Sequence, residues 1–205
     1  MEITNIKVYD LEEAVVASGL PMKAGFGDFE FYSQAKRVRD KTDKEDYEKN
    51  IKRADRLAAS PSNSGHCNFL SGVLVSFNMT ATIKFWEQFQ RYHFKQIVSS
   101  QSTMHKLESM LKDGTASFIY KTDIRAVQLL YQLYKEKATF ETLVYSCPLG
   151  LQLTARISTN YLQLKTIYKQ RKGHKLEEWE KFCNFIEELP YSYWITDKGD
   201  SNDRK

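Results

Sequence analysis

Residues 147–180 read CPLGLQLTARISTNYLQLKTIYKQRKGHKLEEWE, and this stretch says most about the fold. Residues 151–158 alternate apolar and polar side chains, which is the two-residue period of a half-buried strand. From Asn160 to Leu189 the pattern changes to that of a helix, and Gly173 marks a point where the helix can be interrupted. The stretch therefore predicts a strand followed directly by one or two helices.

The N-terminal part predicts a further strand and helices. Residues 3–10, ITNIKVYD, alternate as a first strand, and residues 11–19 continue into a short helix closed by Gly19. Residues 33–59 are highly charged and contain neither proline nor glycine, which favours one or two solvated helices with many ion pairs. A nucleic-acid-binding arm over Lys36–Arg56 is the alternative use of these charges.

The middle of the chain combines a strand pattern with a helical one. Residues 69–82, FLSGVLVSFNMTAT, have the β-branched and aromatic content of a buried strand. Residues 85–98, FWEQFQRYHFKQIV, carry aromatic side chains on helical spacing. This spacing predicts a helix on which Trp86, Phe89 and His93 share one face.

Residues 122–138 predict another helix, and we expect its apolar stripe to pack on the sheet. At 205 residues the chain is within the range of one domain, and it contains no internal repeat or heptad array. The sequence therefore predicts one α/β or α+β domain over residues 1–195, followed by a polar tail over residues 196–205.

Composition favours a cytoplasmic protein. Lys and Arg number 30 against 26 Asp and Glu, with both signs mixed along the chain, which suits a soluble protein with local anion sites. This balance alone says little about nucleic acid, and no nucleic-acid partner is expected. The N-terminus lacks the basic region of a signal peptide, and no apolar run is long enough to cross a bilayer. The widely spaced Cys67, Cys147 and Cys183 fit free thiols in a reducing compartment.

Several catalytic classes lack their motifs. No two of the four histidines, His66, His93, His105 and His174, have the local spacing of zinc ligands, so no metal site is expected. The sequence also has no Gly-rich phosphate loop and no Gly-x-Ser-x-Gly elbow. Nucleotide hydrolysis of the Walker type and serine-hydrolase chemistry therefore have no support.

Three separated blocks resemble the flavin-dependent thymidylate synthases, in the family's order and at nearly its distances. SGHCNFLSGVLVSF (64–77) is similar to the family's His-x-x-Pro-Phe-Glu-His segment before a strand, and QFQRYHFKQIVSSQS (88–102) to its Arg-His-Arg, seven residues, Ser signature. The third block, within 147–180, matches a series of Pro, Asn, Arg, His and Trp-Glu through Pro148, Asn160, Arg171, His174, Trp179 and Glu180. AVVAS (14–18) resembles the family's Ala-Arg-Val-Ser turn.

The resemblance implies a central, mostly antiparallel sheet flanked by helices, in a homotetramer with FAD and deoxyuridylate sites at subunit junctions. In the family, reduced flavin carries the hydride, and a methylene group passes from a folate to the pyrimidine. A reduced folate and NADPH are thus further expected substrates, and the family's distribution suggests a phage or bacterial source. The resemblance assigns flavin contacts to Ser18, His66, Asn68, Arg91, His93 and Asn160, and nucleotide contacts to Gln88, Ser100, Ser102 and Arg171.

The central signature departs from the family pattern. It reads either Arg91-Tyr92-His93, with one extra residue before Ser102, or Tyr92-His93-Phe94, with the spacing kept. Neither register preserves Arg-His-Arg. Ser71 also replaces the glutamate of the first block, and Ser100 replaces a glutamate that precedes the signature serine.

The phosphate side of the expected nucleotide site departs further. Met104 and Val144 stand where the family has arginines for the nucleotide phosphate. Each charge-assisted hydrogen bond that such an arginine would make is worth about 1.5–3 kcal/mol. Other cations must compensate if the nucleotide is still bound, and the candidates are Arg125, Arg156 and His105.

Two functions of different classes follow. One is a flavin-dependent enzyme of this type acting on a uridine nucleotide. The other is a noncatalytic oligomer of the same fold that binds or sequesters a nucleotide-like ligand.

Overall fold

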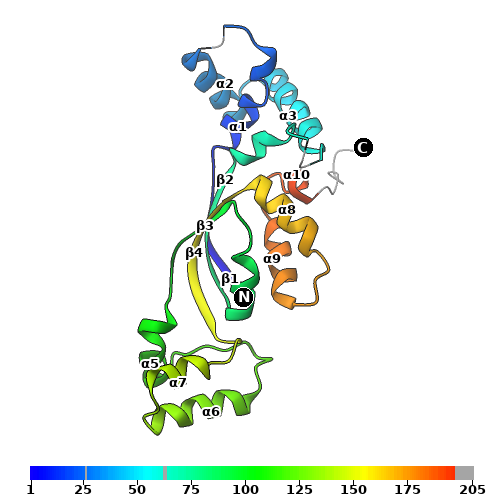
Figure 1. Ribbon diagram of the computed structural model, residues 1–205. Helices are drawn as coiled ribbons and strands as arrows, with labels where there is room; N and C mark the ends of the chain where they lie inside the picture. The colour runs from blue at the N-terminus through cyan, green and yellow to red at the C-terminus, as the bar shows by residue number, and fades with distance from the viewer. Residues whose placement is uncertain (26, 62–63, 197–205) are drawn as a thin grey trace. The chain divides into compact units, whose positions relative to one another are not determined.

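The computed structural model describes residues 1–25, 27–61 and 64–196. Four strands, β1 (Glu2–Tyr9), β2 (Leu74–Thr82), β3 (Lys95–Ser100) and β4 (Gln152–Asn160), form one antiparallel sheet in the order β1-β2-β4-β3 (Figure 1). The strands expected at the start of the chain, before residue 82 and after Pro148 are confirmed as β1, β2 and β4. The expected α+β class is confirmed too. Residues 197–205, nearly all of the expected tail, lie outside the described residues.

Helices make up much of the rest of the described chain. Their bounds are α1 (Leu11–Ala17), α2 (Asp28–Asp40), α3 (Lys44–Ala58), α4 (Ile83–Phe89), α5 (Thr103–Asp113), α6 (Ile124–Lys135), α7 (Phe140–Tyr145), α8 (Tyr161–Arg171), α9 (Glu177–Glu187) and α10 (Tyr193–Thr196). Short 3₁₀ turns lie at η1 (Leu20–Met22) and η2 (Asn68–Ser71).

The chain divides into two compact units. Unit 1 comprises Met1–Asn5 and Phe77–Ile157, and unit 2 comprises Ile6–Ser76 and the residues from Ser158 onward. The strands β1, β2 and β4 each begin in one unit and end in the other.

The core of unit 2 is built largely by its C-terminal helices. Trp179 and Phe182 of α9 and Tyr161 of α8 are fully buried. Asn160 starts α8, because its side-chain oxygen accepts the Gln163 N–H at 2.8 Å. The predicted helix from 160 to 189 is interrupted between α8 and α9, as expected near a glycine.

The charged residues 33–59 form two helices, as their composition allows. Both α2 and α3 pack against α1. Arg37 pairs with Asp46 across the two helices at 3.2 Å, and Lys52 pairs with Glu48 along α3 at 3.4 Å. The expectation of ion-paired helices is therefore confirmed.

The C-terminal helix α10 is fastened to α3 by a shared acceptor. Asp55 Oδ1 accepts the Trp194 Nε1–H at 2.7 Å and the Tyr193 hydroxyl at 2.9 Å. The Trp194 ring is almost fully buried, so its N–H has no access to water. These two hydrogen bonds order the last described part of unit 2.

A cluster of leucines forms the core between the helices of unit 1. Its members are Leu107, Leu111, Leu130, Leu143 and Leu151. We expected the apolar stripe of residues 122–138 to pack on the sheet, but α6 packs mainly against α5 and α7. Leu130 is the only buried residue of α6, and it lies in the leucine cluster that α5, α6 and α7 share.

The helix predicted over residues 85–98 is wrong in its second half. α4 ends at Phe89, and β3 begins at Lys95. His93 lies in the connection and does not share a helix face with Trp86. The helical spacing of the aromatic residues hid the β-branched pair Ile97-Val98, which continues as a strand beside β4.

Candidate functional site

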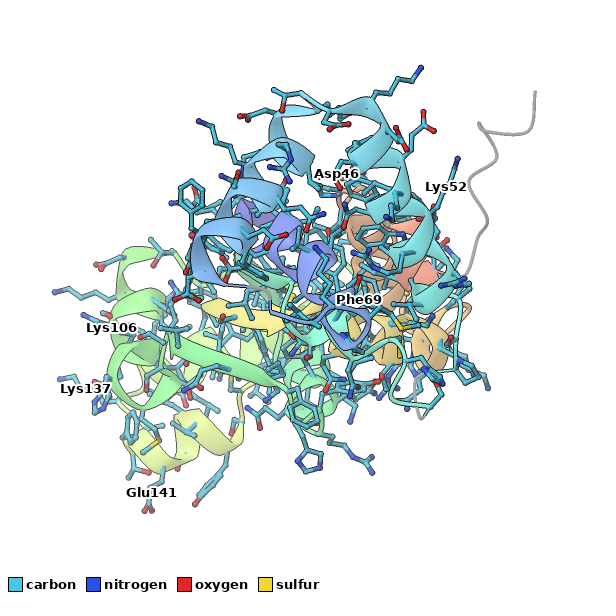
Figure 2. All side chains as sticks on the ribbon, turned by 90° about the horizontal axis from the view of Figure 1, so that it is seen from above. Asp46, Lys52, Phe69, Lys106, Lys137 and Glu141 are labelled. Atoms are coloured by element: carbon cyan, nitrogen blue, oxygen red, sulfur yellow. The ribbon has the colours of Figure 1, made fainter. Side chains whose placement is uncertain are left out.

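Unit 1 carries an open groove of about 810 Å³ along β3, β4 and the first half of α5. Its basic lining residues are Lys106 and Arg156, together with the imidazole of His105 (Lys106 is labelled in Figure 2). Its hydroxyls come from Ser99, Ser100, Ser102, Ser109, Thr115 and Thr154. No carboxylate of the described residues lines it, so the groove is suited to an anion.

The connection from β3 into α5 places Ser100 and Ser102 at the groove. Gln101 continues the pairing with β4, because its N–H donates to the Thr154 carbonyl and its side-chain oxygen accepts the Thr154 N–H, both at 2.9 Å. The Ser102 carbonyl accepts the Lys106 N–H at 3.0 Å and so begins α5. The Ser102 hydroxyl makes no capping hydrogen bond within the described chain.

Arg156 is held from one side only. Its Nη1 donates to the Asn5 carbonyl at 2.9 Å and to Asn78 Oδ1 at 3.1 Å. Nη2 and Nε have no hydrogen-bond partner among the described residues. The guanidinium is therefore ordered by the sheet and keeps donors for a ligand.

A smaller pocket of about 340 Å³ adjoins the groove. Its apolar wall includes Ile83, Trp86, Ile97 and Leu153, and the Trp86 Nε1–H donates to the Leu153 carbonyl at 3.1 Å. Pocket and groove share Ser100, Gln101, Ser102 and Ala155. An apolar pocket beside a cationic groove suits a ligand with a flat ring and an anionic group.

The other unit 1 residues assigned by resemblance lie outside both hollows. Gln88 is half-buried in the last turn of α4, and its carbonyl accepts the Arg91 N–H at 3.3 Å. Arg91 and His93 are exposed in the connection from α4 to β3. The structure therefore brings Ser100 and Ser102 together in the groove, but not Gln88, Arg91 and His93 with them.

Of the three candidate compensating cations, two line the groove. These are Arg156 and His105. Arg125 instead forms an exposed pair with Asp123, with 2.6 Å between Nη2 and Oδ2. Arg125 lines neither the groove nor the adjoining pocket.

In unit 2, Ser18 belongs to a network around Arg53. The Ser18 hydroxyl donates to the Val15 carbonyl at 2.7 Å and accepts from Arg53 Nε at 3.0 Å. Arg53 also donates to Asn50 Oδ1 at 2.6 Å, and burial lowers its pKa. A groove of about 700 Å³ borders this network and is lined by Gly19, Lys23, Lys49, Lys52, Arg53 and Arg56, together with two glutamates and Met22.

The remaining assigned residues of unit 2 have different surroundings. His66 and Asn68 are exposed at the η2 turn. Asn160 uses its side-chain oxygen to cap α8. Arg171 stacks on the buried Trp179, with 4.5 Å from Cζ to the ring centroid.

Sequence reasoning missed Lys106, Asn78 and Gln101 in the groove and Arg53 beside Ser18. The helix α5 was also unexpected, although Leu107 and Leu111 have helical spacing after the Ser102 cap. Recognising α5 would have placed His105 and Lys106 next to the serines. Nothing local to Asn78 or Arg53 marks either residue for a ligand site.

The part of the chain that the structure describes shows neither a metal-binding cluster nor a membrane-spanning helix. It contains no group of three or more His, Cys, Asp or Glu side chains placed to hold a metal ion. No helix in it has the length and apolar character needed to span a membrane.

Solved structures match nearly the whole chain. The flavin-dependent thymidylate synthase ThyX from Helicobacter pylori, complexed with FAD and dUMP, gives a TM-score of 0.69 at 15% identity, with 96% of this chain and 99% of that chain covered. A second structure of ThyX from that organism with FAD and dUMP gives the same score and identity. The UMP/dUMP methylase PolB from Streptomyces cacaoi, bound with 5-Br dUMP, gives 0.58 at 14% identity, with 91% and 88% covered.

No family model matches the chain, and no curated protein matches it either. The fold is therefore identified by structure, over almost the full length of both partners in the comparison. The chain has the fold of the flavin-dependent thymidylate synthases.

Proposed function

We propose that this protein is a flavin-dependent enzyme acting on a uridine nucleotide, with transfer of a one-carbon or related group to the pyrimidine. The observation that carries the proposal is the joined pair of hollows in unit 1. The pocket beside Trp86 suits a flat ring, and the groove at Arg156 suits a phosphate. The similar folds of ThyX and PolB, solved with dUMP and 5-Br dUMP, support the same ligand class.

FAD is the proposed cofactor, and one feature of unit 2 fits its pyrophosphate. A Cβ on Gly19 would lie 2.7 Å from Arg53 Cζ, so the glycine leaves the guanidinium room beside the backbone. Lys49, Lys52 and Arg56 add positive charge to the same groove. Bound FAD would supply hydride chemistry, and a reduced folate and NADPH are the proposed further substrates.

The residue assignments remain proposals in two groups. For flavin we propose Ser18, His66, Asn68 and Asn160 of unit 2 and Arg91 and His93 of unit 1. For the nucleotide we propose Gln88, Ser100 and Ser102 of unit 1 and Arg171 of unit 2. We further propose that residues 1–195 act as one domain in a cytoplasmic homotetramer.

A noncatalytic nucleotide-binding protein is the second candidate, and specific contacts favour it. The Ser18 hydroxyl and the Asn160 side-chain oxygen are already used in internal hydrogen bonds. Met104 and Val144 offer no charge where the related enzymes are expected to have arginines. A protein with these features can keep the nucleotide groove after losing the flavin chemistry.

Flavin retention tests the proposal. The purified protein is incubated with FAD, freed of excess ligand, and compared by absorbance with the double variant Arg91→Ala, His93→Ala. Arg125→Ala is the matched control, because this exposed arginine pairs with Asp123 outside both hollows. We expect retained flavin that only the double variant loses.

Two results distinguish the candidates. A colourless protein that retains no flavin at saturation, but releases a nucleotide on denaturation, would favour the noncatalytic function. Equal flavin retention by all three proteins would remove Arg91 and His93 from the proposed flavin contacts.

A further inference from the structure

We infer that the unit 1 groove recognises the phosphate monoester of its nucleotide, and that Arg156, Lys106 and His105 read it. This inference rests on the proposed function and names the group by which the site selects its substrate. It differs from the pattern expected from the resemblance, in which arginines at positions 104 and 144 would hold that phosphate.

The groove is lined by basic side chains and by no acidic residue of the described chain. Lys106 and His105 come from α5, and Arg156 comes from β4. None of the three has a carboxylate within ion-pairing distance among the described residues, and none of the described lining residues is acidic. The two positive charges of Lys106 and Arg156, with the His105 imidazole and several hydroxyls beside them, match a dianionic group with several acceptor oxygens.

The Arg156 guanidinium is held in place at one nitrogen only. Both of its internal hydrogen bonds use Nη1, with Asn5 and Asn78 as acceptors. These bonds fix the plane of the guanidinium before a ligand arrives, so little side-chain entropy remains to be lost on binding. Nε and Nη2, which donate to none of the described residues, can donate to two oxygens of one phosphate.

Met104 and Val144, the positions at which the resemblance expects arginines, do not line the groove. Val144 is partly buried and packs against the leucine cluster, so this position faces the core of unit 1 and does not line the groove. Met104 is 59% exposed in the first turn of α5 and does not line the groove. Neither position contributes to the present groove, whereas the three basic side chains line it.

Isothermal titration of the full chain, with FAD present, tests the inference by comparing dUMP, deoxyuridine and inorganic phosphate. Arg156→Gln should weaken dUMP binding about 10- to 100-fold, the range for loss of a charge-assisted pair. Lys106→Gln should weaken it about three- to tenfold, since an exposed lysine contributes less than a held arginine. Deoxyuridine affinity should stay within twofold in both variants.

Two controls keep the test sharp. Arg125→Gln removes an exposed arginine outside the groove and should leave dUMP affinity unchanged. Arg156→Lys keeps the charge and loses the two-pronged donor, so it should fall between the wild type and Arg156→Gln. Lys106→Gln remains informative if Arg156→Gln lowers the melting temperature, because the Lys106 side chain makes no hydrogen bond or ion pair with any described residue.

The inference is overturned if Arg156→Gln and Lys106→Gln bind dUMP with the wild-type affinity. It is also overturned if their affinity for deoxyuridine falls by the same factor as their affinity for dUMP. A wild type that binds no dUMP would end the uridine proposal. Inorganic phosphate then decides the groove separately. Phosphate binding that Arg156→Gln loses keeps the anion site, and no phosphate binding rejects the site as well.

Discussion

Met104→Arg adds a charge in the exposed first turn of α5, next in sequence to residues that line the groove, without disturbing the core. The side chain is 59% exposed in the first turn of α5, two residues after Ser102. If the phosphate held by Arg156 lies near the start of α5, where Ser102 lines the groove, a guanidinium at position 104 gains a contact with it. The resemblance expects an arginine at this position, so the variant restores a charge that the chain lacks.

Two opposing effects set the expected size. A charge-assisted hydrogen bond is worth about 1.5–3 kcal/mol, and ordering an exposed arginine offsets part of it, so dUMP binding should tighten roughly three- to 30-fold. A positive charge in the first turn of a helix costs about 0.3–1 kcal/mol. For a chain of this size that cost lowers the melting temperature by about 1–4 °C.

Titration with dUMP and deoxyuridine, beside a thermal melt, measures both effects. Met104→Gln is the uncharged control and should change neither dUMP affinity nor melting temperature appreciably. Val144→Arg is the opposite control, since it puts a charge against the leucine cluster and should destabilise unit 1. If Met104→Arg lowers the melting temperature but leaves dUMP affinity within twofold, the phosphate does not lie near the start of α5.

Three other perturbations have defined outcomes. Asp55→Ala leaves the buried Trp194 N–H without its acceptor and should lower the free energy of unfolding in urea by about 2–3 kcal/mol. Asp55→Asn keeps an acceptor oxygen and should lower it by less. If both variants lose the same free energy, the effect is due to the charge of Asp55. Trp179→Leu removes the aromatic ring on which Arg171 stacks, so in the same titration it should weaken dUMP binding several-fold more than Trp179→Phe does. If the two variants bind dUMP equally well, Arg171 is removed from the proposed nucleotide contacts. Burial raises the pKa of the Cys147 thiol to about 11, so alkylation of Cys147 at pH 8 should be roughly 100-fold slower than that of a free thiol. The contribution of the protonated thiol to the free energy of unfolding should be full below pH 9 and lost as pH rises through 11. Alkylation at the free-thiol rate would contradict this.

The sequence predicted the elements whose local pattern agrees with their tertiary surroundings. β2 and β4 alternate because one sheet face is buried in each, and α8 begins at Asn160 because the residue that ends the strand also caps the helix. The two charged helices α2 and α3 were predictable because residues 33–59 contain no breaker. Three residues of each helix are buried and most of the others stay in contact with water, so tertiary packing agrees with the charged composition.

The errors arose where tertiary contacts decided between two local patterns. Residues 85–98 carry aromatic residues on helical spacing, yet Lys95–Ser100 pairs with β4 and becomes a strand. The helix α6 was predicted, but its packing partners were not, because α5 was unrecognised. The same omission left Lys106 out of the candidate site, since its neighbourhood with Ser102 depends on a helix turning at that residue.

The placement of charge in unit 1 connects these observations. A basic residue at position 144 would bring its charge against the leucine cluster, and any burial of an unpaired charge there is costly. A basic residue at position 156 is held half-buried by the Asn5 carbonyl and the Asn78 side chain, which satisfy part of its donors. The sheet therefore provides acceptors for the arginine that we propose to bind the phosphate, whereas position 144 faces leucine side chains. On this reasoning, the absence of arginine at 144 and the presence of Arg156 are linked, and a chain that restored the first at the expense of the second would lose stability without recovering affinity.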